Sequence, residues 1–295
     1  MTTIALIGPG AIGGTVGLAL AEQGHDLVIC AHQAFCELGL TRADNKQRRS
    51  KPVKAITAPA EAKPADWVLL CVKSHQTDAA AAWLKATLGP ATKLAVLQNG
   101  VEHRAHVAPY VSQGNAVVPV MIMLPAERTA PGEITLFGSA ALTAPDDAAG
   151  RDFAALFAGS FIRAGTDPDF TSRAWEKLCL NAPGGALSVL TLHPGPIAES
   201  KELAALARRF VEECMAVGRA EGARFPEGFA DRVIAMFSAP GGRGNSMYYD
   251  RRDGKPLEWE ARNGVIRRLG AKHGIATPIS DVVVPLLKFL SKTSS

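Results

Sequence analysis

Residues 3–24 read TIALIGPGAIGGTVGLALAEQG. The apolar run at 4–7 predicts a buried strand, and the alanine- and leucine-rich segment that follows predicts a helix. A GxGxxG motif stands between them, in the setting of a dinucleotide site. Gly8 permits the tight turn, Gly10 lets a pyrophosphate approach the backbone, and Gly13 lets the helix pack on the strand. We therefore predict that the cofactor is bound by Gly8, Gly10, Ala11, Ile12 and Gly13.

Length and composition limit the class of protein. A chain of 295 residues with 47% hydrophobic content is long enough for two domains. No apolar run approaches the roughly 18 residues of a membrane span, so no membrane association is expected. Met1 leads directly into the first strand without a signal-peptide pattern, and the five cysteines contain no CxxC pair. We therefore expect a cytoplasmic protein.

Charge and histidine spacing exclude two other classes. A net charge of +4 without a basic, aromatic-interleaved helix does not indicate nucleic-acid binding. His103 and His106 are three residues apart, but no third ligand is near and HExxH is absent, so no metal site is predicted. One group of basic residues is expected to lie in a solvated loop: Arg42, Lys46, Arg48, Arg49 and Lys51.

Apolar strands alternate with helices in the first half of the chain. Beyond the first, strands are expected at 26–31, 53–57, 66–72, 93–98 and 116–123, with a helix at 79–88. This order predicts an α/β fold, a Rossmann-type doubly wound parallel sheet covered on both faces. Two further strands within 132–144 are expected at an edge of that sheet.

The second half is expected to be all-helical. Leu203, Leu206, Phe210, Cys214 and Val217 recur at helical spacing, and similar patterns cover 226–238, 257–272 and 279–290. Turn-forming residues at 165–169 mark the boundary. We predict an NAD(P)-binding Rossmann domain at 1–167 and a helical substrate and dimerisation domain at 168–295.

Two stretches follow strands at the carboxyl edge of the predicted sheet, where ligands of such sheets bind. Lys73 and Gln76 come after the fourth strand and would face the cofactor. Asn99 comes after the fifth, where its amide can hold a carboxamide or a carboxylate.

Two further stretches lie in the helical half. Lys177 and Asn181 are four residues apart and share a helix face. A lysine near apolar walls has a lowered pKa, which suits a proton donor to a forming alkoxide. Ser246 lies in NSMYYD, after a loop expected at 241–244, and Glu258 lies on the next helix.

The chain resembles the ketopantoate reductase (2-dehydropantoate 2-reductase) family along nearly its whole length. The matching stretches stand in the family's order: GPGAIGG, VKSHQT, LQNG, WEKLCLN, NSMYYD and LEWEARNG. The resemblance implies NADPH-dependent reduction of a 2-oxo acid, 2-dehydropantoate to pantoate, in pantothenate biosynthesis. It also implies that Lys177 is the general acid and that Glu258 holds the substrate hydroxyl. Hydrogen bonds to substrate or cofactor are implied for Asn99, Asn181 and Ser246, and cofactor contacts for Lys73 and Gln76.

The first departure from the family concerns the cofactor. His32 stands where well-known members carry an arginine for the 2′-phosphate, and no acidic residue for the ribose of NAD replaces it. We expect His32 to contact the cofactor and Arg42, Arg48 or Arg49 to reach the phosphate. NADPH is predicted, and NADH stays open.

The second departure concerns the substrate pocket. Pro183 is expected to kink or stop its helix, and Gly185 leaves space where an amide would reach the substrate. Arg262 is expected to pair with Glu258 four residues earlier. A different 2-oxo acid therefore stays open as the substrate, as do a non-catalytic NAD(P)-binding regulatory protein and a homodimer. A methyltransferase that uses the glycine loop would leave the second half unexplained.

Overall fold

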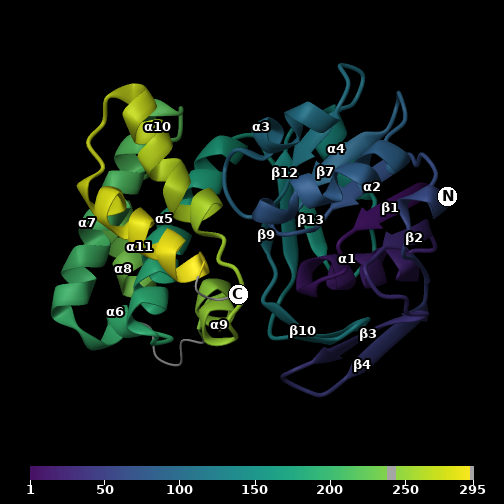
Figure 1. The fold of residues 1–295 in the computed structure, drawn as a ribbon, viewed down its shortest axis with the longest axis horizontal. Helices are drawn as coiled ribbons and strands as arrows, with labels where there is room; N and C mark the ends of the chain where they lie inside the picture. The colour runs from purple at the N-terminus through teal and green to yellow at the C-terminus, as the bar shows by residue number, and fades with distance from the viewer. Residues whose placement is uncertain (238–243, 293–295) are drawn as a thin grey trace. The chain divides into compact units, whose positions relative to one another are not determined.

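The computed structural model describes residues 1–237 and 244–292. Contacts divide the chain into two units, Met1–Phe170 and Thr171–Ser295, whose elements are labelled in Figure 1. Neither unit contains a helix, within the described ranges, that is long and apolar enough to cross a membrane.

The first unit is built on a six-stranded sheet, and this confirms the predicted Rossmann-type α/β class. Its order is β5-β2-β1-β6-β7-β8, and all its neighbouring strands are parallel. Strand order reverses between β1 and β6, which is where ligands of such sheets bind. The strands are β1 (Thr3–Ile7), β2 (Asp26–Cys30), β5 (Lys54–Ile56), β6 (Trp67–Leu70), β7 (Lys93–Val96) and β8 (Val117–Pro119).

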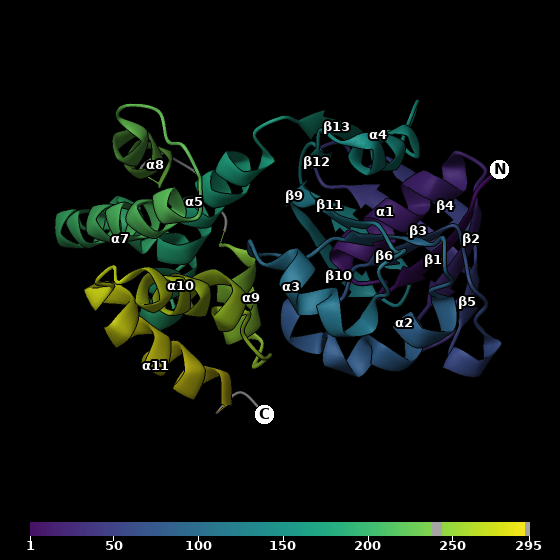
Figure 2. The same cartoon turned by 90° about the horizontal axis from the view of Figure 1, so that it is seen from above.

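Helices cover both faces of this sheet. Alternate residues of a strand point to opposite faces, so Leu6 belongs to one core cluster and Ile7 to the other. The cluster of Leu6 includes side chains of α1 (Ala11–Glu22) and α4 (Ala148–Ala155), and that of Ile7 includes α2 (Ala81–Thr87) and α3 (His103–Val107). Figure 2 shows these two pairs of helices on opposite sides of the strands.

A second sheet lies where we expected a solvated loop. The basic cluster lies in and beside an antiparallel hairpin of β3 (Glu37–Arg42) and β4 (Arg48–Pro52). This hairpin extends β10 (Ala126–Ala130) and β11 (Glu133–Leu136) in the order β10-β11-β3-β4. Leu38 and Leu40 are at most 1% exposed, and a Cβ at Gly17 of α1 would lie 3.0 Å from Leu38. The loop prediction was wrong because these two alternating leucines are buried against a helix distant in sequence.

Two other strand predictions also need correction. The single strand expected at 116–123 is divided into β8 and β9 (Met121–Met123), which belong to different sheets. The strands expected at 132–144 are β11 and β12 (Ala141–Pro145), and neither is an edge of the large sheet. The third sheet is β13-β12-β9, and β13 (Arg163–Asp167) takes in part of the turn-forming cluster at 165–169.

The second unit contains no strand in its described part, and its predicted helices are present. Phe210, Cys214 and Val217 are fully buried on one face of α7, as their spacing predicts. Residue 238 of the helix expected at 226–238, and 241–243 of the expected loop, lie outside the described residues. The helices are α5 (Phe170–Thr191), α6 (Pro196–Glu199), α7 (Lys201–Ala220), α8 (Phe229–Phe237), α9 (Ser246–Arg252), α10 (Val265–His273) and α11 (Pro278–Lys292).

Helix α5 does not stop at Pro183, so the prediction of a stop was wrong. Pro183 removes the hydrogen bond to the carbonyl of Cys179, four residues earlier, yet the helix continues through it. Two carbonyls beside the proline accept hydrogen bonds from distant side chains. Asn263 Nδ2 donates to the Ala182 carbonyl at 3.1 Å, and Asn245 Nδ2 donates to the Gly184 carbonyl at 3.0 Å. Both asparagines come from later in the chain, so a local pattern does not reveal their support.

Candidate active site

Of the three motif glycines in the turn between β1 and α1, only Gly10 leaves space for a ligand. Gly8 has a φ of +90°, and a Cβ there would lie 2.8 Å from the Val72 nitrogen. A Cβ at Gly13 would lie 2.2 Å from the Gly8 carbonyl oxygen, whereas one at Gly10 would meet nothing within 4 Å. The turn is thus closed by Gly8 and Gly13 and open at Gly10, which fits a pyrophosphate beside the backbone.

Gly10 is also the N-cap of α1, and no side chain caps this helix end. The first N–H groups of an α-helix have no partner within the helix, and its dipole favours an anion there. The first turn contains no acidic residue that would repel one. Ala11 and Ile12 begin this turn, so their backbone lies where the motif predicts a phosphate contact.

Gln98 connects the two loops that carry Lys73, Gln76 and Asn99. Its Nε2 donates to the Val72 carbonyl at 3.1 Å and to Thr77 Oγ1 at 2.9 Å. His103 Nε2 lies 2.9 Å from the Gln98 carbonyl oxygen, which can accept a hydrogen bond from it. The loops after β6 and β7 are therefore held together at the carboxyl edge of the sheet. Sequence reasoning did not assign Gln98 a role; a polar residue ending an apolar strand was the available signal.

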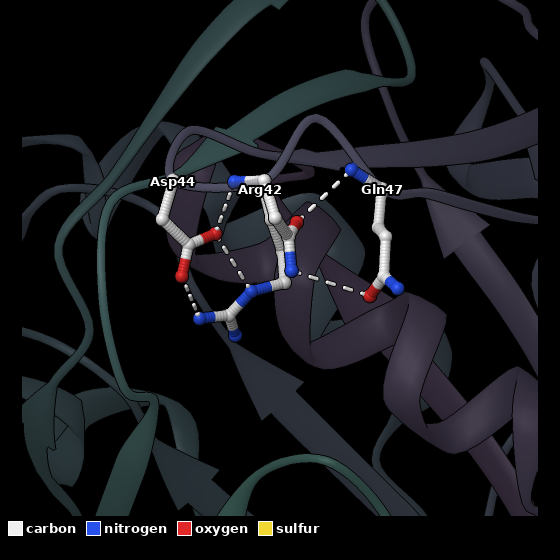
Figure 3. A network of polar contacts seen from close by, with 4 residues as sticks. Arg42, Asp44 and Gln47 are labelled. Carbon is white, nitrogen blue, oxygen red and sulfur yellow. Dashed lines mark hydrogen bonds and ion pairs between the residues drawn. The ribbon is translucent and has the colours of Figure 1, made fainter.

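His32 lies two residues beyond β2 and is exposed at this same edge. Arg42, one of the three arginines expected to reach the 2′-phosphate, forms a bidentate pair with Asp44 (Figure 3). Its Nε and Nη2 donate to the two carboxylate oxygens at 3.1 and 2.6 Å, and the backbone N–H of Arg42 donates to the Gln47 carbonyl at 2.9 Å. A phosphate would therefore compete with Asp44 for this guanidinium.

The other two arginines are also paired. Arg48 Nη2 lies 2.9 Å from Glu37 and 2.7 Å from Glu133, across the strands of the second sheet. Arg49 Nη1 lies 2.8 Å from Glu22 at the end of α1. These contacts hold the hairpin against its neighbours and occupy both guanidinium groups. His32 is the basic residue nearest in sequence to the end of β2.

In the second unit, Lys177 and Asn181 lie one turn apart on α5. Burial lowers the pKa of Lys177 to about 7, the positive charge of Arg262 adds to this effect, and the Glu258 carboxylate opposes it. The lysine is therefore balanced between its ammonium and amine forms near neutral pH, as a proton donor in a reaction at this pH requires.

Glu258 and Arg262 form the ion pair expected from their spacing. Glu258 Oε2 lies 3.8 Å from Arg262 Nη2, and both side chains are 4% exposed. Glu258 lies just before the helical segment that begins at Trp259, and not on the helix as expected. Arg262 lies in a π turn, Glu260–Gly264, which the helical period did not predict. Such turns are rare and often occur at functional sites.

Ser246 is bound to this pair through Arg262, whose Nη2 donates to Ser246 Oγ at 2.6 Å. Asn245, the N-cap of α9, accepts from the backbone N–H groups of Met247 and Tyr248 and so fixes the start of the helix. Its Nδ2 also donates to Ser188 Oγ at 3.1 Å. Asn245 thereby holds the turn of Ser246 against α5, a positioning role that an asparagine just before a helix indicates but that we did not predict.

The second unit thus brings Lys177, Glu258, Arg262 and Ser246 into one electrostatic group, with Asn181 a turn away from the lysine. An ammonium can stabilise and protonate a developing alkoxide, and a carboxylate can accept a hydrogen bond from a hydroxyl. Across 1–237 and 244–292, no three His, Cys, Asp or Glu side chains are grouped as metal ligands.

Two family descriptions match the chain. Ketopantoate reductase PanE/ApbA matches residues 4–148, and Ketopantoate reductase PanE/ApbA C terminal matches residues 169–291. Among similar proteins, the 2-dehydropantoate 2-reductase of Caulobacter vibrioides is 43% identical over 97% of this chain and 98% of its own. That of Mycobacterium tuberculosis is 44% identical over 97% of each chain.

Solved structures agree with these matches. A PanE/ApbA family ketopantoate reductase from Ralstonia eutropha is 28% identical with a TM-score of 0.89, over 99% of each chain. A dimeric ketopantoate reductase from Staphylococcus aureus is 25% identical with a TM-score of 0.87, over 99% of this chain and 100% of its own. A D-mandelate dehydrogenase solved with NADH and anilino(oxo)acetate shares the fold at 22% identity and a TM-score of 0.87, over 99% of each chain.

Proposed function

The chain belongs to the ketopantoate reductase family, and from that premise we propose that it reduces 2-dehydropantoate to pantoate with NADPH. The observation that carries this proposal is Lys177, whose pKa is lowered to about 7 beside Glu258 and Arg262. A protein that only binds a nucleotide has no need for a proton donor prepared in this way.

Each unit has its own part in the proposed reaction. The bound cofactor supplies the hydride that reduces the ketone carbon. Gly10, the first turn of α1, Lys73, Gln76 and Asn99 would hold that cofactor on residues 1–167, the proposed nucleotide-binding domain. The helical domain, 168–295, would bind the substrate through the residues grouped around Lys177.

Lys177 would stabilise the negative charge that develops on the ketone oxygen and then donate its proton to that oxygen. Glu258 would accept a hydrogen bond from the substrate hydroxyl and so select hydroxylated 2-oxo acids. Asn181 and Ser246 would donate hydrogen bonds to the remaining oxygens of the substrate.

We propose NADPH over NADH because the end of β2 is followed by His32 and Gln33, with no carboxylate to bind the two ribose hydroxyls of NAD. The pairing of Arg42, Arg48 and Arg49 with carboxylates reduces their availability to the 2′-phosphate. His32 is therefore the favoured contact. The D-mandelate dehydrogenase of the same fold was solved with NADH, which makes NADH the necessary comparison.

The test is oxidation of NADPH, and in parallel of NADH, after addition of 2-dehydropantoate to the purified protein. Wild-type protein is expected to oxidise NADPH rapidly, and Lys177→Ala to bind the cofactor without turnover. Undiminished turnover by Lys177→Ala would refute the role of the lysine. Failure of the wild type with 2-dehydropantoate, but not with other 2-oxo acids, would identify a different substrate.

We also propose a homodimer formed through α11. Val282, Leu286 and Phe289 recur on one face of this helix and are 64%, 47% and 65% exposed. The relative from Staphylococcus aureus is dimeric, so a second copy of this chain is the partner we expect. Light scattering should give the mass of a dimer, and Leu286→Lys should give a monomer; a monomeric wild type would refute the proposal.

The cytoplasmic location stays a prediction.

A further inference from the structure

The family resemblance implies no role for Arg262, yet this residue contacts Ser246 and Glu258 in the proposed substrate site. Its guanidinium donates to Ser246 Oγ at 2.6 Å and lies 3.8 Å from Glu258 Oε2. Its positive charge also acts on Lys177. The residue is 3% exposed, and its Nε is buried without a hydrogen-bond partner.

Among Lys177, Arg262 and Glu258, positive charge exceeds negative charge when Lys177 is protonated. With Lys177 protonated, Lys177 and Arg262 contribute two positive charges, and Glu258 contributes one negative charge. Burying an unbalanced charge is costly unless a ligand supplies the opposite one. A 2-oxo acid carries one carboxylate, directly bonded to the carbonyl carbon that Lys177 would serve. The group is thus complementary to the single negative charge of such a substrate.

The geometry of the guanidinium supports the same ligand. Its contact with Glu258, at 3.8 Å, is longer than a hydrogen bond, although the two side chains are buried together. An arginine present only to neutralise Glu258 would be expected to form the short bidentate contact typical of such pairs. Arg262 instead directs Nη2 to the hydroxyl of Ser246, and its fork is not saturated.

Gly185 supplies the space in which Arg262 lies. A Cβ at position 185 would be 3.8 Å from Arg262 Nη1 and 3.1 Å from Met247 Sδ. A longer side chain there would meet the guanidinium or the methionine, so the absence of a side chain at 185 and the presence of an arginine at 262 depend on each other. The space that an amide side chain at position 185 would fill is thus next to the guanidinium of Arg262, which comes from another helix.

Resting on the proposed function, we propose that Arg262, together with the Ser246 hydroxyl, binds the carboxylate of the 2-oxo acid and determines specificity for it. Lys177 then engages the ketone oxygen and Glu258 the hydroxyl, so each polar group of the substrate has its own partner. The site would select acids over uncharged ketones of the same shape.

The experiment compares kcat and KM for 2-dehydropantoate and for its primary amide, which has a similar shape but no charge. Arg262→Gln is expected to lower kcat/KM for the acid about 100-fold, mainly through KM, and to change that for the amide by less than about 3-fold. Arg262→Lys keeps the charge and should restore part of the loss. Arg267→Gln is the matched control, because Arg267 pairs with Asp281 on the surface at 2.8 Å.

An equal loss for acid and amide in Arg262→Gln, with Arg262→Lys equally impaired, would show that Arg262 has only a structural role and would overturn the inference. A wild type that reduces the amide as well as the acid would also overturn it. A wild type that reduces neither compound, nor any other 2-oxo acid, would instead refute the proposed function on which the inference depends.

Discussion

The pH dependence of reduction depends on the ionisation of Lys177, a partly buried lysine. The pKa of Lys177 is lowered from 10.5 to about 7, chiefly by burial. This depression corresponds to roughly 5 kcal/mol of weaker stabilisation of the ammonium, since one pH unit is about 1.4 kcal/mol. About half of the lysine is protonated at pH 7, and about a tenth at pH 8. If the ammonium is the proton donor, kcat/KM should fall about fivefold from pH 7 to pH 8 and about tenfold for each further pH unit.

The neighbours of Lys177 should move this limb in opposite directions. Glu258 raises the pKa of Lys177, so Glu258→Gln should shift the alkaline limb to lower pH. Arg262 lowers that pKa, so Arg262→Gln should shift the limb to higher pH. Both variants are expected to lose activity as well, and the diagnostic quantity is therefore the position of the limb and not the maximal rate.

The assay is the initial rate of NADPH oxidation at low 2-dehydropantoate concentration, measured from about pH 5.5 to about pH 9.5. The unfolding temperature is recorded at each pH, so that loss of structure is separated from deprotonation. A limb close to the ordinary lysine value, or one that neither variant moves, would refute the assignment of Lys177 as the proton donor.

Three further predictions test how the two units are built. Gly10→Ala should leave the unfolding temperature unchanged and weaken NADPH binding, measured by titration, at least about tenfold. Gly13→Ala should lower the free energy of unfolding in urea by about 2 kcal/mol, because its Cβ would overlap the Gly8 carbonyl. Arg42→Ala should change NADPH affinity less than about 2-fold, and His32→Ala should lower it more. A larger loss of affinity in Arg42→Ala than in His32→Ala would contradict this ranking. Asn245→Ala should cost about 1–2 kcal/mol of stability and raise KM for the 2-oxo acid, since it removes the cap that places Ser246; an unchanged KM would contradict this positioning role.

Local sequence patterns were sufficient for the main sheet. Strands β1, β6 and β7 are apolar apart from Thr3 and Lys93 at their first positions, and the glycines after β1 have the spacing of a dinucleotide-binding motif. The same reasoning missed the second sheet: β3 and β4 form a local hairpin, but the other partner of β3 is β11, which comes much later in the chain. A pairing partner at Glu133–Leu136 gives residues 37–42 no local signal.

Residue types and helical spacing also determined much of the candidate site. The spacing of Lys177 and Asn181, the pairing of Glu258 with Arg262 and the lowered pKa of a lysine beside apolar residues followed from the sequence. The continuation of α5 through Pro183 did not follow from the sequence, and the amides of Asn245 and Asn263 that bind the carbonyls beside the proline come from distant segments.

The sequence by itself determined the fold class, the glycine turn and the chemical types of the site residues, since these depend on periodicity and on contacts between near neighbours in the chain. Apart from the pair of Glu258 and Arg262, which their spacing predicts, only the tertiary structure decided which charges lie together. It paired Arg42, Arg48 and Arg49 with carboxylates, and it placed the guanidinium of Arg262 beside Ser246 and the bare face of Gly185. Electrostatic interactions act through space, so side chains far apart in sequence set each other's roles once the chain is folded.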